Sequence, residues 1–296
     1  MNSIDIESKK FLGQPKNFVS IFNALLFDGK QVLKPEYLKD ENSELVMNVS
    51  SKHVDIIKRY EDGTYLDLFV IESQSYVDQC MVARVMEYES VARMRYIRQN
   101  FKKHVPMHTR LPMILTVVLY VGESKWNAAK RLSELEIIHP GFEDMFNEFK
   151  LNLIELNTNH KYNTGEKATQ DFFDLLRMIY RKQILKEDLD REFNRDALYF
   201  AYVVTKNKEL LNIYQESEKG DVKVCRALDE MFEESTNKGI QMGIKQGIEL
   251  GIERGVKNTQ IKITIKMLVR KNQTLEEISE IVGLDLDALR ELKKNI

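Results

Sequence analysis

The sequence has few of the residues that stabilise small secreted domains or span membranes. Cys80 and Cys225 are its only cysteines, far apart, which argues against a disulfide scaffold and a Cys-ligated zinc site. The chain opens without an apolar leader, and the longest nearly apolar run, Pro112–Gly122, is too short to span a bilayer. The net charge is −2. We therefore predict a soluble cytoplasmic protein without a membrane partner, in which any nucleic-acid surface is a local basic patch.

Strand and helix patterns alternate through residues 1–186, which predicts an α/β domain. The run NFVSIFNALLF stops at Asp28-Gly29 and is typical of a short buried helix. MILTVVLYVG is a continuous apolar run, typical of a central strand that is buried on both faces. The predicted helices are 17–27, 78–103 and 168–182, the predicted strands are 54–60, 64–74, 113–122 and 151–156, and a polar segment covers 30–51.

The remainder of the chain is predicted to be helical, because strand signals vanish beyond Glu187. We divide it into a helical region at 187–236 and a segment at 237–296 that contains a Gly-Ile repeat and a terminal pair of helices. The signals for this pair are a capping box at Thr274 and Glu277, a glycine stop at Gly283 and an N-cap at Asp285.

Two of the predicted strands form a hairpin around Asp62-Gly63. This dipeptide between apolar runs favours a two-residue type I′ turn, which needs positive φ at both central residues. A turn of four residues would keep the same side-chain parity. With a two-residue turn, the predicted cross-strand pairs are Glu61 with Thr64, Arg59 with Leu66, Ile57 with Leu68 and Asp55 with Val70.

The parity of this hairpin brings two carboxylates to one side of the sheet. Asp55, Glu72 and Gln74 project from the same face, whereas Asp67 projects from the other. The first two are diagonal neighbours, about 7–8 Å apart at Cα. Because a charged Glu at the end of an apolar strand is costly to bury alone, a hard dication is a suitable partner, and oxygen-only ligands favour Mg²⁺ or Mn²⁺. The alternative is an ordinary amphipathic edge with solvated acids.

The text around this hairpin resembles a known family. Asp55 followed by Glu72-Ser73-Gln74 at a strand end resembles the PD-(D/E)XK nuclease core. More specifically, the chain is similar to the recombination-promoting nuclease (Rpn)/putative transposase family over about residues 17–180. The matching text is FNALLFDGKQVLKPEYL, IESQ, PMILTVVLYVG followed by Trp126, and the helix pattern Asp78, Met81, Arg84, Tyr88.

The resemblance implies a nuclease-like mixed sheet flanked by helices, and Mg²⁺-dependent hydrolysis of DNA phosphodiester bonds linked to recombination or defence against foreign DNA. Asp55 and Glu72 would be the metal ligands, and Gln74 stands where many such nucleases have Lys. Gln supplies no positive charge, so it would orient water or phosphate by hydrogen bonding. Relatives show an acid in the first helix where this chain has Ser20. A site short of that acid would leave a catalytically silent DNA-binding or oligomeric scaffold, which is our second hypothesis. Action on RNA is a third.

A basic stretch follows the hairpin. Between Ser90 and Gly122 there is no Asp or Glu, and such a local excess of positive charge suits contact with a phosphate backbone. The alternative is a solvated helix end, where cations are favoured. Arg84 and Tyr88 either face the active site or are a surface Arg and a core Tyr. The predicted DNA-binding residues are Arg84, Arg93, Arg95, Arg98, Lys102 and Lys103.

A Gly-Ile repeat occupies residues 239–256 at an interval of four. Each glycine inside a helix costs about 1 kcal/mol relative to Ala, and close packing against another helix would recover that cost. Four residues rotate by about 400°, so the stripe drifts around the helix and favours a crossed pair over a heptad coil. We predict homodimerisation through this helix; the alternative is docking on the nuclease domain. The predicted contact residues are Gly239, Gly243, Gly247, Gly251 and Gly255.

Overall fold

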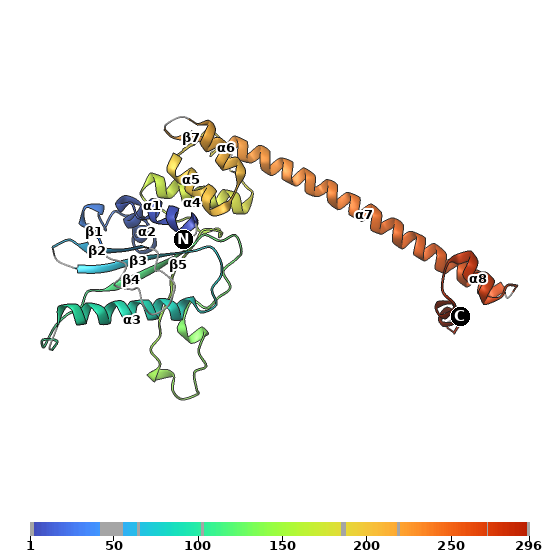
Figure 1. The fold of residues 1–296 in the computed structure, drawn as a ribbon, viewed down its shortest axis with the longest axis horizontal. Helices are drawn as coiled ribbons and strands as arrows, with labels where there is room; N and C mark the ends of the chain where they lie inside the picture. The colour runs from blue at the N-terminus through green and yellow to red at the C-terminus, as the bar shows by residue number, and fades with distance from the viewer. Residues whose placement is uncertain are drawn as a thin grey trace. The chain divides into compact units, whose positions relative to one another are not determined.

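The computed structural model describes residues 3–41, 56–63, 66–101, 104–184, 188–217, 220–270 and 272–294. It divides into two compact units, Met1–Glu230 and Met231–Ile296, and each is described here by itself. The first is a mixed sheet flanked by helices, and the second is helical (Figure 1). The predicted fold class is confirmed.

The sheet of the first unit has the order β1-β2-β3-β4-β5. Antiparallel pairing joins β1 to β2 and β2 to β3, whereas β4 is parallel to both β3 and β5. The strands are β1 (Leu38–Asp40), β2 (Ile56–Glu61), β3 (Leu66–Gln74), β4 (Ile114–Tyr120) and β5 (Asn152–Glu155). The apolar run that predicted a central strand is β4, and all of its residues from Ile114 to Tyr120 are buried except Leu115, which is half-buried.

Helices cover the two faces of this sheet (Figure 1). On one face lies α3 (Met81–Asn100), whose Tyr88 and Ala92 pack against even-numbered residues of β3. On the other face lies α2 (Pro15–Phe27), whose Phe22 stacks on Phe69 at 4.8 Å between ring centroids. The predicted end of this helix is confirmed, because Asp28 adopts a left-handed conformation at φ 52°.

Further elements complete the first unit. Phe11 stacks on Phe200 at 5.0 Å, so the N-terminal helix packs against a helix far along the chain. The buried Asp171 accepts hydrogen bonds from Arg191 (2.6 Å) and from the Asn194 N–H (2.7 Å), which fixes the start of the following helix. These helices are α1 (Ser3–Leu12), α4 (Lys167–Arg181), α5 (Arg195–Thr205) and α6 (Lys208–Glu216), and short 3₁₀ helices lie at η1 (Pro35–Tyr37), η3 (Leu132–Glu134) and η4 (Glu143–Met145).

Three short strands depart from the sequence interpretation. We predicted no strand beyond Glu187, but β6 (Glu192–Phe193) pairs antiparallel with β7 (Val222–Lys223). β1 lies within residues 30–51, which we described only as a polar segment. Strands of two or three residues are too short to show an alternating pattern, so their sequence carries no periodic signal.

The predicted register of the hairpin is wrong by two residues, although its parity is correct. Glu61 pairs with Leu66, Arg59 with Leu68 and Ile57 with Val70. Gly63 has a φ of 90°, but Asp62 is not among the residues with positive φ in the described part of the chain. A type I′ turn requires positive φ at both positions, so the strands are joined by four residues instead of two.

The second unit contains most of α7 (Cys225–Arg270), together with α8 (Leu275–Val282) and α9 (Leu286–Lys294). Leu268, Ile278 and Leu289 are buried together at its centre. The predicted caps are confirmed: Thr274 and Glu277 form a reciprocal capping box, Gly283 ends α8 at φ 69°, and the Asp285 carboxylate accepts the N–H of Ala288 at 2.7 Å.

Candidate active site

Glu72 and Gln74 lie at the end of β3, on the face that α3 covers. Their alternation with Leu68 and Val70, which pack against α3, places both side chains on this face. Glu72 is only 3% exposed and Gln74 only 5%. The Gln74 amide donates a hydrogen bond of 2.8 Å to Oε1 of Glu72. The predicted pair is therefore a buried carboxylate and the carboxamide that orients it.

Arg84 of α3 contacts the same carboxylate. Its Nη2 donates to Oε1 of Glu72 at 3.2 Å, and its Nη1 forms an ion pair with Oδ2 of Asp78. The hydroxyl of Tyr88 accepts hydrogen bonds from Nε (3.0 Å) and Nη2 (2.7 Å) of the same guanidinium. One Arg thus joins two carboxylates and a phenol. Arg84 therefore contacts Glu72, whereas Tyr88 is a buried core tyrosine whose hydroxyl contacts Arg84.

The local sequence explains why these side chains meet. β3 ends at Gln74 and α3 begins at Met81, so a short loop returns the chain across the strand end. Met81, Val82 and Val85 are buried against β4 and fix the rotation of the helix. Positions 84 and 88 are one helical turn apart and therefore share a face.

Asp78 holds both this loop and the Arg84 side chain in place. Its Oδ1 accepts the backbone N–H of Cys80 at 2.9 Å, in the turn that leads into α3. Its other oxygen pairs with Arg84. Asp78 was part of the family text in the sequence but was not predicted as a site residue. Its spacing of six residues from Arg84 gives no direct signal, because the two are on different elements.

The surroundings shift the pKa values of two members of this network. Burial alone would lower the pKa of Arg84, but its hydrogen bonds to Asp78 and Tyr88 and the charge of Glu72 raise it above its usual value. Burial raises the pKa of the Tyr88 hydroxyl, and the hydrogen bond from Arg84 opposes that rise. Arg84 is therefore a permanent cation at this strand end, and Tyr88 is neutral at physiological pH.

The second predicted metal ligand, Asp55, lies outside the described residues. In the sequence it precedes Ile56, and Ile56 pairs with Ile71, the residue before Glu72. In the described part of the chain, no three His, Cys, Asp or Glu side chains are grouped closely enough to hold a metal ion. The donors that β3 offers are carboxylate and carboxamide oxygens, which suit Mg²⁺. A complete site would therefore need Asp55.

Ser20 is buried at a contact between two helices. Its hydroxyl lies 2.7 Å from the carbonyl oxygen of Asn17 and 2.8 Å from the hydroxyl of Thr169 in α4. Both Ser20 and Thr169 are fully buried. Where we expected relatives to have an acid, this chain thus has a hydroxyl whose hydrogen bonds lie within α2 and between α2 and α4.

The predicted DNA-binding residues fall into three environments. Arg93, Arg95 and Arg98 lie on the second half of α3, where the first two are half-buried and Arg98 is exposed. Arg84 is on the same helix but contacts Glu72 and Asp78. The remaining two, Lys102 and Lys103, are outside the described residues.

The five glycines of the repeat lie on α7 and are exposed. A Cβ atom built at any of them would meet nothing within 4 Å. The isoleucines beside them are also exposed, with Ile240 at 55% and Ile252 at 62%. The space beside this stripe is therefore open.

The sequence matches a known protein family. Residues 9–210 match the model of the family described as "Putative transposase, YhgA-like", which covers more than half of the chain. The chain belongs to this family. No curated protein and no solved structure matches it.

One further property concerns membranes. Within the described ranges, the structure contains no helix that combines the length and the apolar character needed to cross a bilayer.

Proposed function

We propose that this protein is a Mg²⁺-dependent nuclease that hydrolyses phosphodiester bonds in DNA. Family membership supports a role related to transposition or recombination. The observation that carries the proposal is the Glu72 carboxylate, which is buried at a strand end and receives hydrogen bonds from Gln74 and Arg84 on one oxygen. Burying such a group costs several kcal/mol in general, and sites that bear this cost are often functional.

In this proposal Asp55 and Glu72 hold the ion, with Mn²⁺ as an alternative to Mg²⁺. When bound, the ion would polarise the scissile phosphate and lower the pKa of an attacking water. Gln74 keeps the Glu72 carboxylate in its orientation through the 2.8 Å hydrogen bond. The ligand oxygens are thereby held in place before the ion binds, which reduces the cost of ordering them.

Arg84 supplies the positive charge that Gln74 lacks. Many nucleases of the resembled class have a Lys two residues after the Glu, where this chain has Gln74. The guanidinium of Arg84 lies 3.2 Å from Glu72 and reaches the same carboxylate from α3. A permanent cation beside the reacting phosphate would stabilise the charge that develops on it. We assign Arg84 this role in place of direct contact with the rest of the DNA.

Arg93, Arg95 and Arg98 contact the phosphate backbone in this proposal, together with Lys102 and Lys103. All five follow Arg84 in the sequence, and three lie with it on α3. DNA binding should therefore weaken steeply as salt increases, because each neutralised phosphate releases counterions.

Incubation of supercoiled plasmid with purified protein tests the proposal. Nicking is expected with Mg²⁺ and not with EDTA, and both Glu72→Gln and Asp55→Asn should abolish it. Asp67→Asn is the matched control, because Asp67 lies on the same strand but on the opposite face. Cleavage that persists in both site variants would contradict the site. A parallel RNA substrate tests the other nucleic acid.

A non-catalytic DNA-binding scaffold is the alternative function. The observation that favours it is the Arg84 cation, which already neutralises part of the Glu72 charge within the chain. Titration with Mn²⁺ distinguishes the two functions independently of cleavage. A nuclease should bind Mn²⁺ more weakly after Glu72→Gln, whereas a scaffold should show no Mn²⁺ binding that depends on Glu72.

A further inference from the structure

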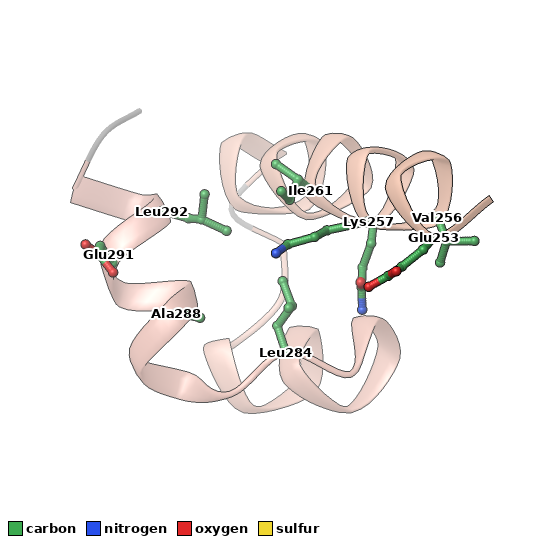
Figure 2. Close-up of a pocket in the computed structure, with 9 residues that line it drawn as sticks. Glu253, Val256, Lys257, Ile261, Leu284, Ala288, Glu291 and Leu292 are labelled. Carbon is green, nitrogen blue, oxygen red and sulfur yellow. The ribbon is translucent and has the colours of Figure 1, made fainter. Parts of the chain in front are cut away.

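The guanidinium of Arg84 is enclosed, and so are the two carboxylates that it contacts. The side chains of Arg84 and Asp78 are each 17% exposed, and that of Glu72 is 4% exposed. Charged residues of the second unit provide a contrast, because Glu253 and Lys257 line an open groove of about 630 Å³ and both are exposed (Figure 2). Water can compensate either charge in that groove. At the end of β3, each charge needs a partner that the protein or a bound ion provides.

Two partners of Arg84 are themselves held in place. Asp78 pairs with Nη1 through one oxygen, and its other oxygen accepts the N–H of Cys80 at 2.9 Å, which fixes it to the loop before α3. The ring of Tyr88 packs in the core, and its hydroxyl accepts hydrogen bonds from Nε at 3.0 Å and from Nη2 at 2.7 Å. Together they define one position for this cation.

The contact between Arg84 and Glu72 is the weaker one that Nη2 makes. Its length of 3.2 Å is at the upper end of the range for a hydrogen bond, whereas Nη2 lies 2.7 Å from the Tyr88 hydroxyl. Gln74 donates to the same oxygen of Glu72 at 2.8 Å. If the 3.2 Å contact opens, Glu72 therefore keeps Gln74, and Arg84 keeps Asp78 and Tyr88.

Arg84 and a divalent cation would compete for the Glu72 carboxylate. Both are positive, and each neutralises the same buried charge, so they repel each other where little water screens them. The other partners of Arg84 decide how strongly it competes. Asp78 and Tyr88 bind the guanidinium at its own position, which lowers its need for Glu72. Without them, Arg84 would pair more strongly with Glu72 and would be harder to displace.

From these contacts we infer that Asp78 and Tyr88 are positioning residues, which raise the affinity of the Glu72 site for a divalent cation by holding Arg84 away from full pairing with Glu72. This inference rests on the proposed function, in which Asp55 and Glu72 hold the ion. Arg84 and the ion exchange as the counterion of Glu72. The displaced guanidinium stays on Asp78 and Tyr88, beside the carboxylate, where it leaves a donor of Nη2 for the substrate phosphate.

Tyr88→Phe in the full-length protein tests the inference without changing a charge. It removes the hydroxyl that accepts two hydrogen bonds from Arg84 and keeps the ring in the core. Affinity for Mn²⁺, measured by titration calorimetry, should fall about threefold or more. Tyr96→Phe is the matched control, because Tyr96 is a half-buried tyrosine on the same helix, and it should leave the affinity unchanged. Unchanged affinity in Tyr88→Phe would overturn the inference.

Asp78→Asn tests the other partner. The carboxamide keeps an oxygen for the Cys80 N–H but has no charge for Arg84, so Mn²⁺ affinity should fall about tenfold. Loss of a nearby negative charge alone also weakens cation binding, so the substitution is repeated in an Arg84→Gln background. There it should lower the affinity by less than about threefold, because the competing cation is gone. Equal losses in the two backgrounds would overturn the inference.

Arg84→Gln alone separates competition from support. This variant should bind Mn²⁺ more tightly than the parent, and weaker binding would contradict the competition. Circular dichroism and urea denaturation establish that each variant folds, and Tyr88→Phe carries the test by itself if Arg84→Gln does not. Failure of the proposed function gives a different result, namely Mn²⁺ binding that Glu72→Gln leaves unchanged. Binding that depends on Glu72 but is the same in Tyr88→Phe and Asp78→Asn contradicts the positioning role alone.

Discussion

The candidate site and the Gly-Ile helix depart in opposite ways from the usual separation of polar surface and apolar core. At the end of β3 a carboxylate is buried, and the chain itself provides Gln74 and Arg84 to bind it. On α7 large apolar side chains such as Ile252 and Val256 are exposed, and a Cβ atom added at the glycines beside them would meet nothing within 4 Å. In the first region, the groups that offset the cost of burying the Glu72 carboxylate belong to the fold itself. The second has large apolar side chains that are exposed, so the two regions should respond differently to mutation.

The largest effect on stability is expected when the carboxylates of Glu72 and Asp78 lose the cation of Arg84. Arg84→Met leaves Glu72 and Asp78 without this guanidinium, and should lower the free energy of unfolding by about 3 kcal/mol. Urea denaturation measures the change. Arg98→Met on the same helix is the control, because Arg98 is exposed, and it should change stability by less than about 0.5 kcal/mol. Equal effects of the two substitutions would show that the Arg84 network contributes little.

A smaller effect, which depends on pH, is expected at Glu89. This side chain of α3 is buried, its Oε1 accepts the N–H of Thr116 at 3.0 Å, and burial raises its pKa above the usual value. The folded state then binds the proton more tightly than the unfolded state, so this group costs stability as the pH rises through its folded pKa.

Glu89→Gln removes this titration. The free energy of unfolding of the variant minus that of the parent should therefore be larger at pH 7 than at pH 4. Urea denaturation of both proteins at each pH measures this difference. Glu87→Gln on the same helix is the comparison for a general loss of negative charge. A stability difference that is identical at the two pH values would contradict the prediction.

The smallest effect is expected in the Gly-Ile helix. Gly243→Ala places a methyl group in open space and should stabilise α7 by about 1 kcal/mol, because Ala loses less backbone freedom than Gly. Thermal melting followed by circular dichroism measures it. Gly247→Ala, at another open position of the same helix, should give a similar gain. A lower melting temperature in either variant would contradict the open space beside these glycines.

Periodic patterns in the sequence predicted the main sheet but not its finer features. The strands around Ile57 and Val70 and their side-chain parity follow from alternation, which a shift of two residues leaves unchanged. The register itself depends on the φ of Asp62, and the dipeptide Asp-Gly does not determine that angle. The short strands β1, β6 and β7 carried too few residues for any period to be visible.

Strand alternation also predicted part of the candidate site, but not the contacts that the helix and the loop make with it. Glu72 and Gln74 share a face because of strand alternation, and the structure places them as expected. The contacts of Arg84 could not be chosen from the sequence, because they depend on how Met81 and Val85 rotate α3 against the sheet. Asp78 joins the network through a loop, and loop geometry has no periodic signal. The roles of Asp55 and of the glycines remain predictions.

The placement of the two cysteines makes the protein a convenient subject for spectroscopic labelling. Cys225 is buried, and burial raises the pKa of its thiol to about 12, so it should react slowly with maleimides. Cys80 is exposed and donates its backbone N–H to Asp78, the residue that pairs with Arg84. A fluorophore attached to the native sequence should therefore occupy a single position next to the Glu72 network, and would report ligand binding there without an engineered cysteine.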